Sequence, residues 1–180
     1  MPDRLRRFAD LDVTPWRNGL GRKADIVTGE GWQLSFAWID GPAPFSTYAG
    51  QERIIALLEG PGCRLDFAGH PPLVLDRPAS PTTFSGDWPA LCEPFGGPSM
   101  VLNLIAERAR WRGSVEILEL EEELALVPLA GPSHAVLLEG EAAIANGPAL
   151  ARHDTVVVAG RLVLQGKRAR LALARLAPLA

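Results

Sequence analysis

The sequence predicts an all-β protein. Its 180 residues include 18 glycines and 16 prolines, dispersed along the chain, which is typical of many short strands joined by turns. Apolar residues either alternate with polar ones or form short runs that end at Gly or Pro. The one segment with helical spacing, 118–126, can equally form two strands with a turn among its three consecutive glutamates, 121–123. This rhythm predicts a sandwich or barrel.

The clearest predicted strand is 32–39, in which large apolar residues alternate with small or polar ones. We expect the face with the two tryptophans to pack against a second sheet. The opposite face, with Gln33, Ser35 and Ala37, is suited to line a cavity in a barrel. Further strands are predicted at 53–58, 63–67, 101–105, 115–120, 135–139, 155–159, 161–164 and 170–176. Turns are expected at 40–42, 59–62, 96–98 and 146–148.

The chain also contains a weak internal repeat. The tetrapeptide at 57–60, Leu-Leu-Glu-Gly, recurs at 137–140, and each copy follows an apolar strand. Similar contexts favour a duplicated β-unit over chance. We therefore expect two halves, 1–112 and 113–180, each supplying one small barrel.

Composition excludes several classes of function. The formal net charge is -3 and no basic stripe is present, which argues against nucleic-acid binding. No apolar run approaches the length of a membrane span, and the polar N-terminus does not resemble a signal peptide, so we expect a cytoplasmic protein. Cys63 and Cys92 lack CxxC spacing and nearby histidines, and we interpret them as small core residues.

The residues do not predict a metal centre or a catalytic nucleophile. His70, His134 and His153 are the only histidines, and no HxH or ExxH spacing occurs. A catalytic metal needs three or four converging ligands, so the three would have to meet from separate loops. Gly-x-Ser-x-Gly and phosphate-binding glycine loops are absent. We therefore assign no catalytic residue, no metal and no cofactor.

Three clusters have residues suited to ligand binding. The first, 15–21, joins Trp16 to an Asn18-Gly19 turn, although it can also be a plain hairpin turn. The second, 44–53, ends at Arg53, which can bind a carboxylate through two hydrogen bonds or can be a surface charge at a strand end. In the third, 96–105, Asn103 lies in an apolar run and needs a hydrogen-bonding partner, either backbone or ligand.

Seven ordered pieces between Trp16 and Arg108 resemble one family. They are Trp16-Arg17-Asn18-Gly19-Leu20-Gly21 with Asp25, Trp32 with Ser35 and Ala37, Gly41-Pro42 with Phe45-Ser46, Gly50 with Arg53, Leu58-Glu59-Gly60, Phe84-Ser85-Gly86-Asp87, and Gly97-Pro98 with Asn103. In this order they resemble the HutD/Ves family, whereas the second half matches it only in length and strand rhythm. The sequence departs from the family pattern at Leu20, Lys23, Asp25 and 101–102, where the family has Gly, Thr, Glu and Asp-Phe.

The resemblance implies a double cupin, that is, two RmlC-like jelly-roll barrels in one chain. It also implies a non-catalytic regulatory role near histidine utilisation, with a small acidic metabolite such as formylglutamate as ligand. We expect Arg53 to bind the carboxylate. The other expected ligand-binding residues are Trp16, Asn18, Gly19, Asp25, Ser35, Phe45, Ser46 and Asn103.

Two rival functions remain open from the sequence. A metal-independent cupin isomerase or epimerase would need a general acid or base, for which Asp25, Tyr48 or a histidine would have to serve. A buried histidine or carboxylate facing the same cavity as Arg53 would favour it. A partner-binding module could instead use Trp88 or Trp111 as an exposed anchor. Open sheet edges also favour a homodimer.

Overall fold

The computed structural model describes residues 4–16 and 18–179, almost all of them in antiparallel β-sheet or turns. They form two units, one of residues 12–111 (the N-terminal unit) and one of residues 112–179 together with 4–11 (the C-terminal unit). The all-β prediction is confirmed. No helix among the described residues is long and apolar enough to cross a membrane.

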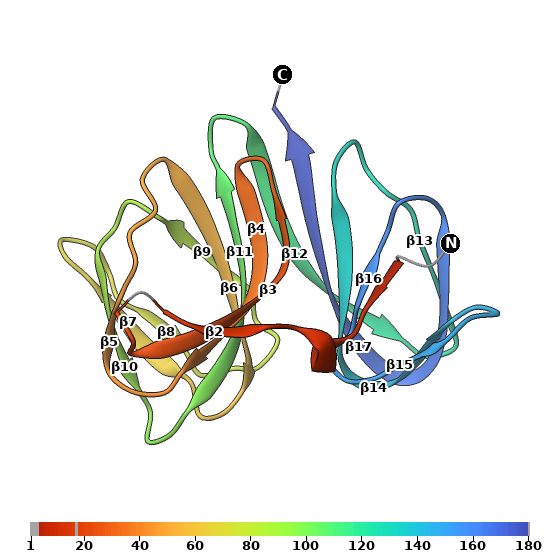
Figure 1. Ribbon diagram of the computed structural model, residues 1–180, viewed down its shortest axis with the longest axis horizontal. Coiled ribbons are helices and arrows are strands. Elements are labelled where there is room, and N and C mark those ends of the chain that lie inside the picture. The colour runs from red at the N-terminus through yellow and green to blue at the C-terminus, as the bar shows by residue number, and fades with distance from the viewer. Residues whose placement is uncertain (1–3, 17, 180) are drawn as a thin grey trace. The chain divides into compact units, whose positions relative to one another are not determined.

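The N-terminal unit is a sandwich of two sheets (Figure 1). The larger sheet has the spatial order β2 (Val13–Pro15), β3 (Gly21–Gly29), β4 (Trp32–Ile39), β11 (Ser99–Glu107), β6 (Gln51–Glu59) and β9 (Thr82–Ser85). The smaller sheet has the order β5 (Ala43–Phe45), β10 (Ala90–Pro94), β7 (Cys63–Phe67) and β8 (Leu73–Leu75).

The core of this unit lies against the small-residue face of β4. Ala37 and Ile39 belong to the same buried cluster as Cys63, Leu65 and Cys92 of the smaller sheet. The smaller sheet of this unit therefore packs against the face of β4 that carries Ala37 rather than against the face that carries Trp32 and Trp38. The side chain of Ala37 is small, so it leaves space between the two sheets. The cavity described below borders on Ala37.

The C-terminal unit contains one branched sheet and its own apolar core. Its strands are β1 (Leu5–Arg6), β16 (Thr155–Val157), β14 (Ser133–Ile144), β17 (Leu162–Pro178) and β12 (Trp111–Leu120), with β13 (Glu123–Leu126) on β17 and β15 (Ala149–Leu150) on β14. A short 3-10 turn, η2 (Phe8–Asp10), follows β1. The segment 118–126 forms two strands rather than a helix.

The first described residues belong to the C-terminal unit, whereas the expected division at 112 assigned them to the N-terminal half. Leu5 and Arg6 pair with Val156 and Thr155, which places them in the C-terminal unit (Figure 1). The buried carboxylate of Asp154 accepts hydrogen bonds from Arg7 Nη1 at 2.7 Å and from the Phe8 amide at 2.8 Å. This segment is therefore fixed by an ion pair as well as by strand pairing.

The expected strands occur near their expected positions, with two corrections. The strand expected at 155–159 ends at Val157. Strands β3 and β10 were not expected. Strands β4 and β7 have the predicted bounds, whereas β6, β11, β12 and β14 extend beyond them. The two strands expected at 161–164 and 170–176 are one continuous strand, β17. Strand β17 pairs with β14 both before and after residues 165–169, which separate the two expected strands. The pairing shifts in register between Leu137 and Glu141 of β14, so the strand continues despite this irregularity.

Both copies of the repeated tetrapeptide end at a glycine with positive φ. Gly60 has φ +87° and Gly140 has φ +82°. A side chain at either position would also collide with a neighbouring strand's backbone. The two glycines thus serve the same conformational purpose in the two units, which supports the interpretation of a duplicated β-unit.

Candidate ligand-binding site

A cavity of about 530 Å³ lies in the N-terminal unit. Its floor is the inner face of the larger sheet, and its wall is formed largely by the segment between β5 and β6. The lining residues are Pro15, Trp16, Lys23, Gln33, Ser35, Ala37, Phe45, Ser46, Thr47, Tyr48, Ala49, Gln51, Arg53, Asn103 and Ile105. Six of the sequence-predicted ligand-binding residues are among them: Trp16, Ser35, Phe45, Ser46, Arg53 and Asn103.

Strand register brings the polar floor residues together. Asn103 on β11 lies opposite Ser35 on β4, while Ile105, two residues further along, lies opposite Arg53 on β6. Directly paired residues point to the same face of a sheet, and so do residues two apart on one strand. Ser35, Asn103 and Arg53 therefore share one face, although they are far apart in the sequence.

Arg53 is a buried cation with no acidic partner. Its side chain is only 5% exposed, and no carboxylate of the described residues forms an ion pair with it. Nη2 donates to Asn103 Oδ1 at 3.1 Å, and Nη1 donates to the Ser46 carbonyl at 3.3 Å. Nε has no hydrogen-bond partner among the described residues. A buried charge in this condition is costly unless another group neutralises it.

Aromatic rings surround the guanidinium of Arg53. Its central carbon lies 5.2 Å from the ring centre of Phe45, 5.3 Å from that of Tyr48 and 4.9 Å from that of Phe84. Burial lowers the pKa of Arg53 to about 10, so the group remains protonated at neutral pH. The rings offset part of the lost hydration by cation–π attraction, but they add no negative charge. The buried guanidinium therefore retains an uncompensated positive charge beside the cavity.

Trp16 and Phe45 meet edge to face in the cavity lining, with ring centres 5.5 Å apart. The Trp16 ring lies against the backbone of Gly21, where an added Cβ would approach ring atom Cδ2 to 2.7 Å. The turn is closed by a hydrogen bond from the Trp16 amide to the Gly21 carbonyl at 2.8 Å. Glycine at position 21 therefore allows the Trp16 indole to pack against the backbone. The rings of Trp16 and Phe45 together form an apolar part of the lining.

Comparison with known proteins identifies the family. The family model described as HutD matches residues 8–174, which is nearly the whole chain. This chain belongs to the HutD family. Trp16, Phe45, Arg53 and Asn103, four of the residues on which the sequence resemblance rests, line the cavity.

Two curated proteins are similar in sequence to this chain. One is an uncharacterised 21.2 kDa protein in the hutC 3' region of Pseudomonas putida, 37% identical over 119 residues. The other is the protein Ves of Citrobacter koseri, 34% identical over 116 residues. The matched part spans 62% of the first protein and 59% of the second, and the same shares of this chain.

Solved structures show the same fold. HutD from Pseudomonas fluorescens SBW25 is 26% identical, with a TM-score of 0.84 over 98% of each chain. A cupin 2 conserved barrel domain protein from Leptotrichia buccalis is only 8% identical, yet it has a TM-score of 0.65 over 97% of each chain. The second likeness shows the fold alone. The HutD family member described here is thus an all-β protein with cupin-like structural neighbours.

Three expected ligand-binding residues do not line the cavity. Asn18 supports its own turn, because its side chain donates to the Pro44 carbonyl at 3.2 Å and accepts from the Leu20 amide at 3.1 Å. Gly19 has φ +70° and forms the exposed bend of that turn. Asp25 accepts hydrogen bonds from Lys23 Nζ at 2.8 and 3.0 Å. Arg17, in the same motif, lies outside the described residues.

Sequence reasoning did not single out several lining residues. Lys23, Thr47, Ala49, Gln51 and Ile105 all contact the cavity. Gln33 and Ala37 were placed on the cavity face through alternation in their strand, and the same rule would have found Ile105 two residues after Asn103. No comparable periodicity exists for Thr47 and Ala49, because they lie outside regular strands.

The histidines and the two candidate anchor tryptophans lie elsewhere. Within the described part of the chain, no three His, Cys, Asp or Glu side chains gather as a metal site would require. His70 stacks on Trp88 at 3.8 Å between ring centres. Trp88 also packs on the core of the N-terminal unit, and Trp111 Nε1 donates to the Glu30 carbonyl at 2.9 Å. Neither tryptophan is fully exposed.

Proposed function

We propose that this HutD family protein binds a small carboxylate in the cavity of its N-terminal unit and acts as a non-catalytic regulatory protein. The observation that carries the proposal is Arg53, a buried guanidinium that faces the cavity and has no acidic partner in the described part of the chain. A carboxylate accepts two parallel hydrogen bonds from a guanidinium and supplies the missing negative charge. Asn103 would orient the guanidinium, and Trp16 and Phe45 would exclude water.

The acidic intermediates of histidine breakdown, such as N-formylglutamate, are the proposed ligands. The Pseudomonas putida relative lies in a hutC region, and the HutD structure from Pseudomonas fluorescens was solved in a formate condition. Formate is the smallest carboxylate. A cavity of about 530 Å³ also has room for a larger acid than formate.

The cavity's composition favours binding over acid–base catalysis. Of the described residues that line it, none is His, Asp or Glu, and Tyr48 is the one sequence-predicted candidate acid or base among them. An isomerase or epimerase needs a general acid or base that operates near neutral pH. The lining consists instead of aliphatic residues, amides, hydroxyls, aromatic rings and the cations Arg53 and Lys23, of which Lys23 is paired with Asp25. This composition suits recognition of an anion.

A thermal-shift screen tests this function. It uses formate, N-formylglutamate, urocanate, glutamate and histidine, each with and without divalent metal ions. A carboxylate at one hundred times its dissociation constant should stabilise the protein by about 2.7 kcal/mol. A shift with a carboxylate and none with metal alone supports the proposal. A shift with metal alone contradicts it, because the histidines would then have to converge.

Arg53→Met supplies the matched variant for this screen. Loss of the paired guanidinium should weaken carboxylate binding by on the order of 2–5 kcal/mol. The variant should still fold, because an apolar side chain of similar length replaces a buried charge. Arg64→Met is the control, since Arg64 is half-exposed and pairs with Asp66 away from the cavity. Full affinity in Arg53→Met would refute the assignment.

A further inference from the structure

The wall of the cavity is held from outside by an exposed polar network. The wall comprises residues 46–51, and five of its six residues line the cavity. Residues 46–50 connect β5 to β6 without belonging to a strand. They therefore lack the ladder hydrogen bonds that hold a sheet, and other contacts must fix their position.

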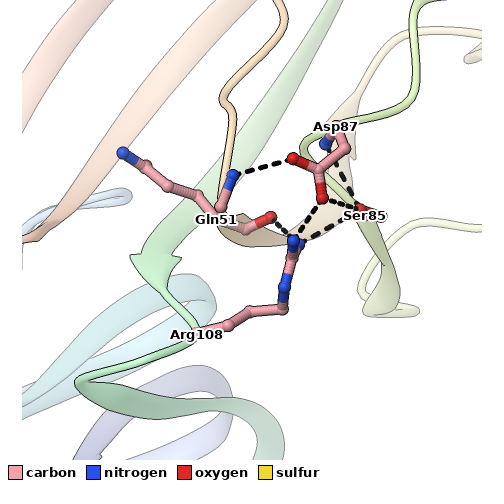
Figure 2. A network of polar contacts seen from close by, with 5 residues as sticks. Gln51, Ser85, Asp87 and Arg108 are labelled. Carbon is pink, nitrogen blue, oxygen red and sulfur yellow. Dashed lines mark hydrogen bonds and ion pairs between the residues drawn. The ribbon is translucent and has the colours of Figure 1, made fainter.

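Asp87 and Arg108 supply those contacts, as Figure 2 shows. Asp87 Oδ1 accepts a hydrogen bond from the Gly50 amide at 2.7 Å, and its other oxygen forms an ion pair with Arg108 Nη2. Arg108 Nη1 donates to the Gln51 carbonyl and to Ser85 Oγ. The Arg108 amide also donates to the Gly50 carbonyl at 3.0 Å. One ion pair thus joins three separate segments at the end of the wall.

The turn that carries Asp87 also contacts the wall through its backbone. The Tyr48 amide donates to the Gly86 carbonyl at 2.7 Å, and the Gly86 amide donates to the Gln51 carbonyl at 2.8 Å. A Cβ at Gly86 would approach the Tyr48 carbonyl oxygen to 2.5 Å. Only glycine permits this close approach, so the turn and the wall are fitted to each other.

The wall in turn contacts Arg53. The Ser46 carbonyl accepts from Arg53 Nη1, and the Tyr48 ring lies beside the guanidinium. From this connected geometry, we propose that Asp87 and Arg108 are positioning residues for the ligand site. They hold the wall against Arg53 without lining the cavity themselves. This inference rests on the proposed carboxylate site but concerns residues that would not touch the ligand.

Because the Asp87–Arg108 ion pair is exposed, its effect on the position of the wall can be distinguished from an effect on the stability of the whole unit. The side chains of Arg108 and Asp87 are 40% and 43% exposed. Exposed ion pairs contribute little to global stability. Their loss should therefore release the wall locally and leave the rest of the N-terminal unit folded.

Amide hydrogen exchange and ligand titration together test the proposal, with Arg108→Gln and Asp87→Asn as variants. Arg110→Gln is the control, because Arg110 is similarly exposed and pairs with Glu30 rather than with the wall. In the Arg108→Gln and Asp87→Asn variants, the amides of Tyr48, Gly50 and Gln51 should exchange at least tenfold faster than in wild type. The dissociation constant for N-formylglutamate should rise about tenfold, while Tm changes by less than about 3 °C.

The outcomes are separable. If amide exchange in the wall is unchanged in Arg108→Gln and Asp87→Asn, the proposal is overturned, whatever their affinity for N-formylglutamate. Faster exchange with unchanged affinity overturns the role in binding. If wild-type protein bound none of the carboxylates, the proposed function would fail, and exchange in the unliganded variants would still decide whether this ion pair holds the wall. Equal effects in Arg110→Gln would also overturn it, because the effect would then be one of surface charge.

Discussion

At the scale of single residues, Arg53 is the most informative side chain in the molecule. Its neighbours are an amide oxygen, a backbone carbonyl and three aromatic rings, all of them without formal charge. Pairing it with an acid of the protein itself would have been a more stable arrangement. The absence of one among the described residues is understandable if the ligand supplies the negative charge.

Asn103→Asp tests this idea within the protein. The substitution places a carboxylate where Asn103 Oδ1 lies, 3.1 Å from Arg53 Nη2, with almost no change of shape. The internal carboxylate should neutralise Arg53 and compete with the ligand, so affinity for N-formylglutamate should fall on the order of tenfold to a hundredfold. Calorimetric titration measures this, and stability should not decrease. Ser35→Ala, which removes a neutral cavity side chain, should change affinity far less.

The sequence predicts these residues singly but not their contact. Arg53 is recognisable as a cation at the start of an apolar strand, and Asn103 as an amide in an apolar run. Their hydrogen bond depends on β6 lying beside β11, although the two residues are 50 positions apart in the sequence. Sheet order is set by packing across the whole unit, and strand periodicity carries no information about it.

At the scale of elements, length alone does not decide which strands the sequence predicts: β7, of five residues, has the predicted bounds, whereas β3, of nine residues, was not predicted. Strands β4 and β7 have the predicted bounds because alternation continues over their whole length. Strands of two to four residues, such as β5, β8 and β15, are too short for any periodicity to be visible. The sequence indicates that segment 44–53 is suited to ligand binding, but it does not predict where the wall lies, because that position depends on contacts with the Gly86 turn.

Gly86→Ala tests the fit between this turn and the wall. The added methyl group would lie 2.5 Å from the Tyr48 carbonyl oxygen and 2.8 Å from that of Gln51, so backbone must move. We expect a loss of on the order of 1–3 kcal/mol in the free energy of unfolding. Denaturant titration measures it. Gly41→Ala is the control, because no atom lies within 4 Å of its added Cβ and its φ is not positive. Equal stability of the two variants would contradict the described packing.

At the scale of the whole molecule, the two units have different roles in this account. The cavity and all of its lining belong to the N-terminal unit. The C-terminal unit contains two buried histidines, His134 and His153, and receives the first described residues of the chain. Its sequence resembles the family least at the level of motifs, yet the family model extends through it to residue 174.

His134 gives the C-terminal unit a predictable response to acid. Burial, with a smaller contribution from Arg6, lowers the pKa of His134 to about 4. In the unfolded chain its pKa is about 6.5, so between pH 6.5 and 4 the unfolded state binds more protons. Stability should therefore fall as the pH falls through this window, by on the order of 3 kcal/mol from this group. Denaturant titrations across the window should show a shallower fall for His134→Gln, and parallel curves would contradict the prediction.

The measurement closest to the central claim is a proton–nitrogen NMR titration that observes the arginine Nε–H groups. The Arg53 resonance is assigned by its absence in Arg53→Met. Because the Arg53 guanidinium faces the cavity, a carboxylate bound to it should shift the signal of its Nε–H group. We predict that N-formylglutamate or formate produces this change in Arg53 with the same dissociation constant as the thermal shift. Saturation by a carboxylate that leaves the Arg53 signal unchanged would contradict the account.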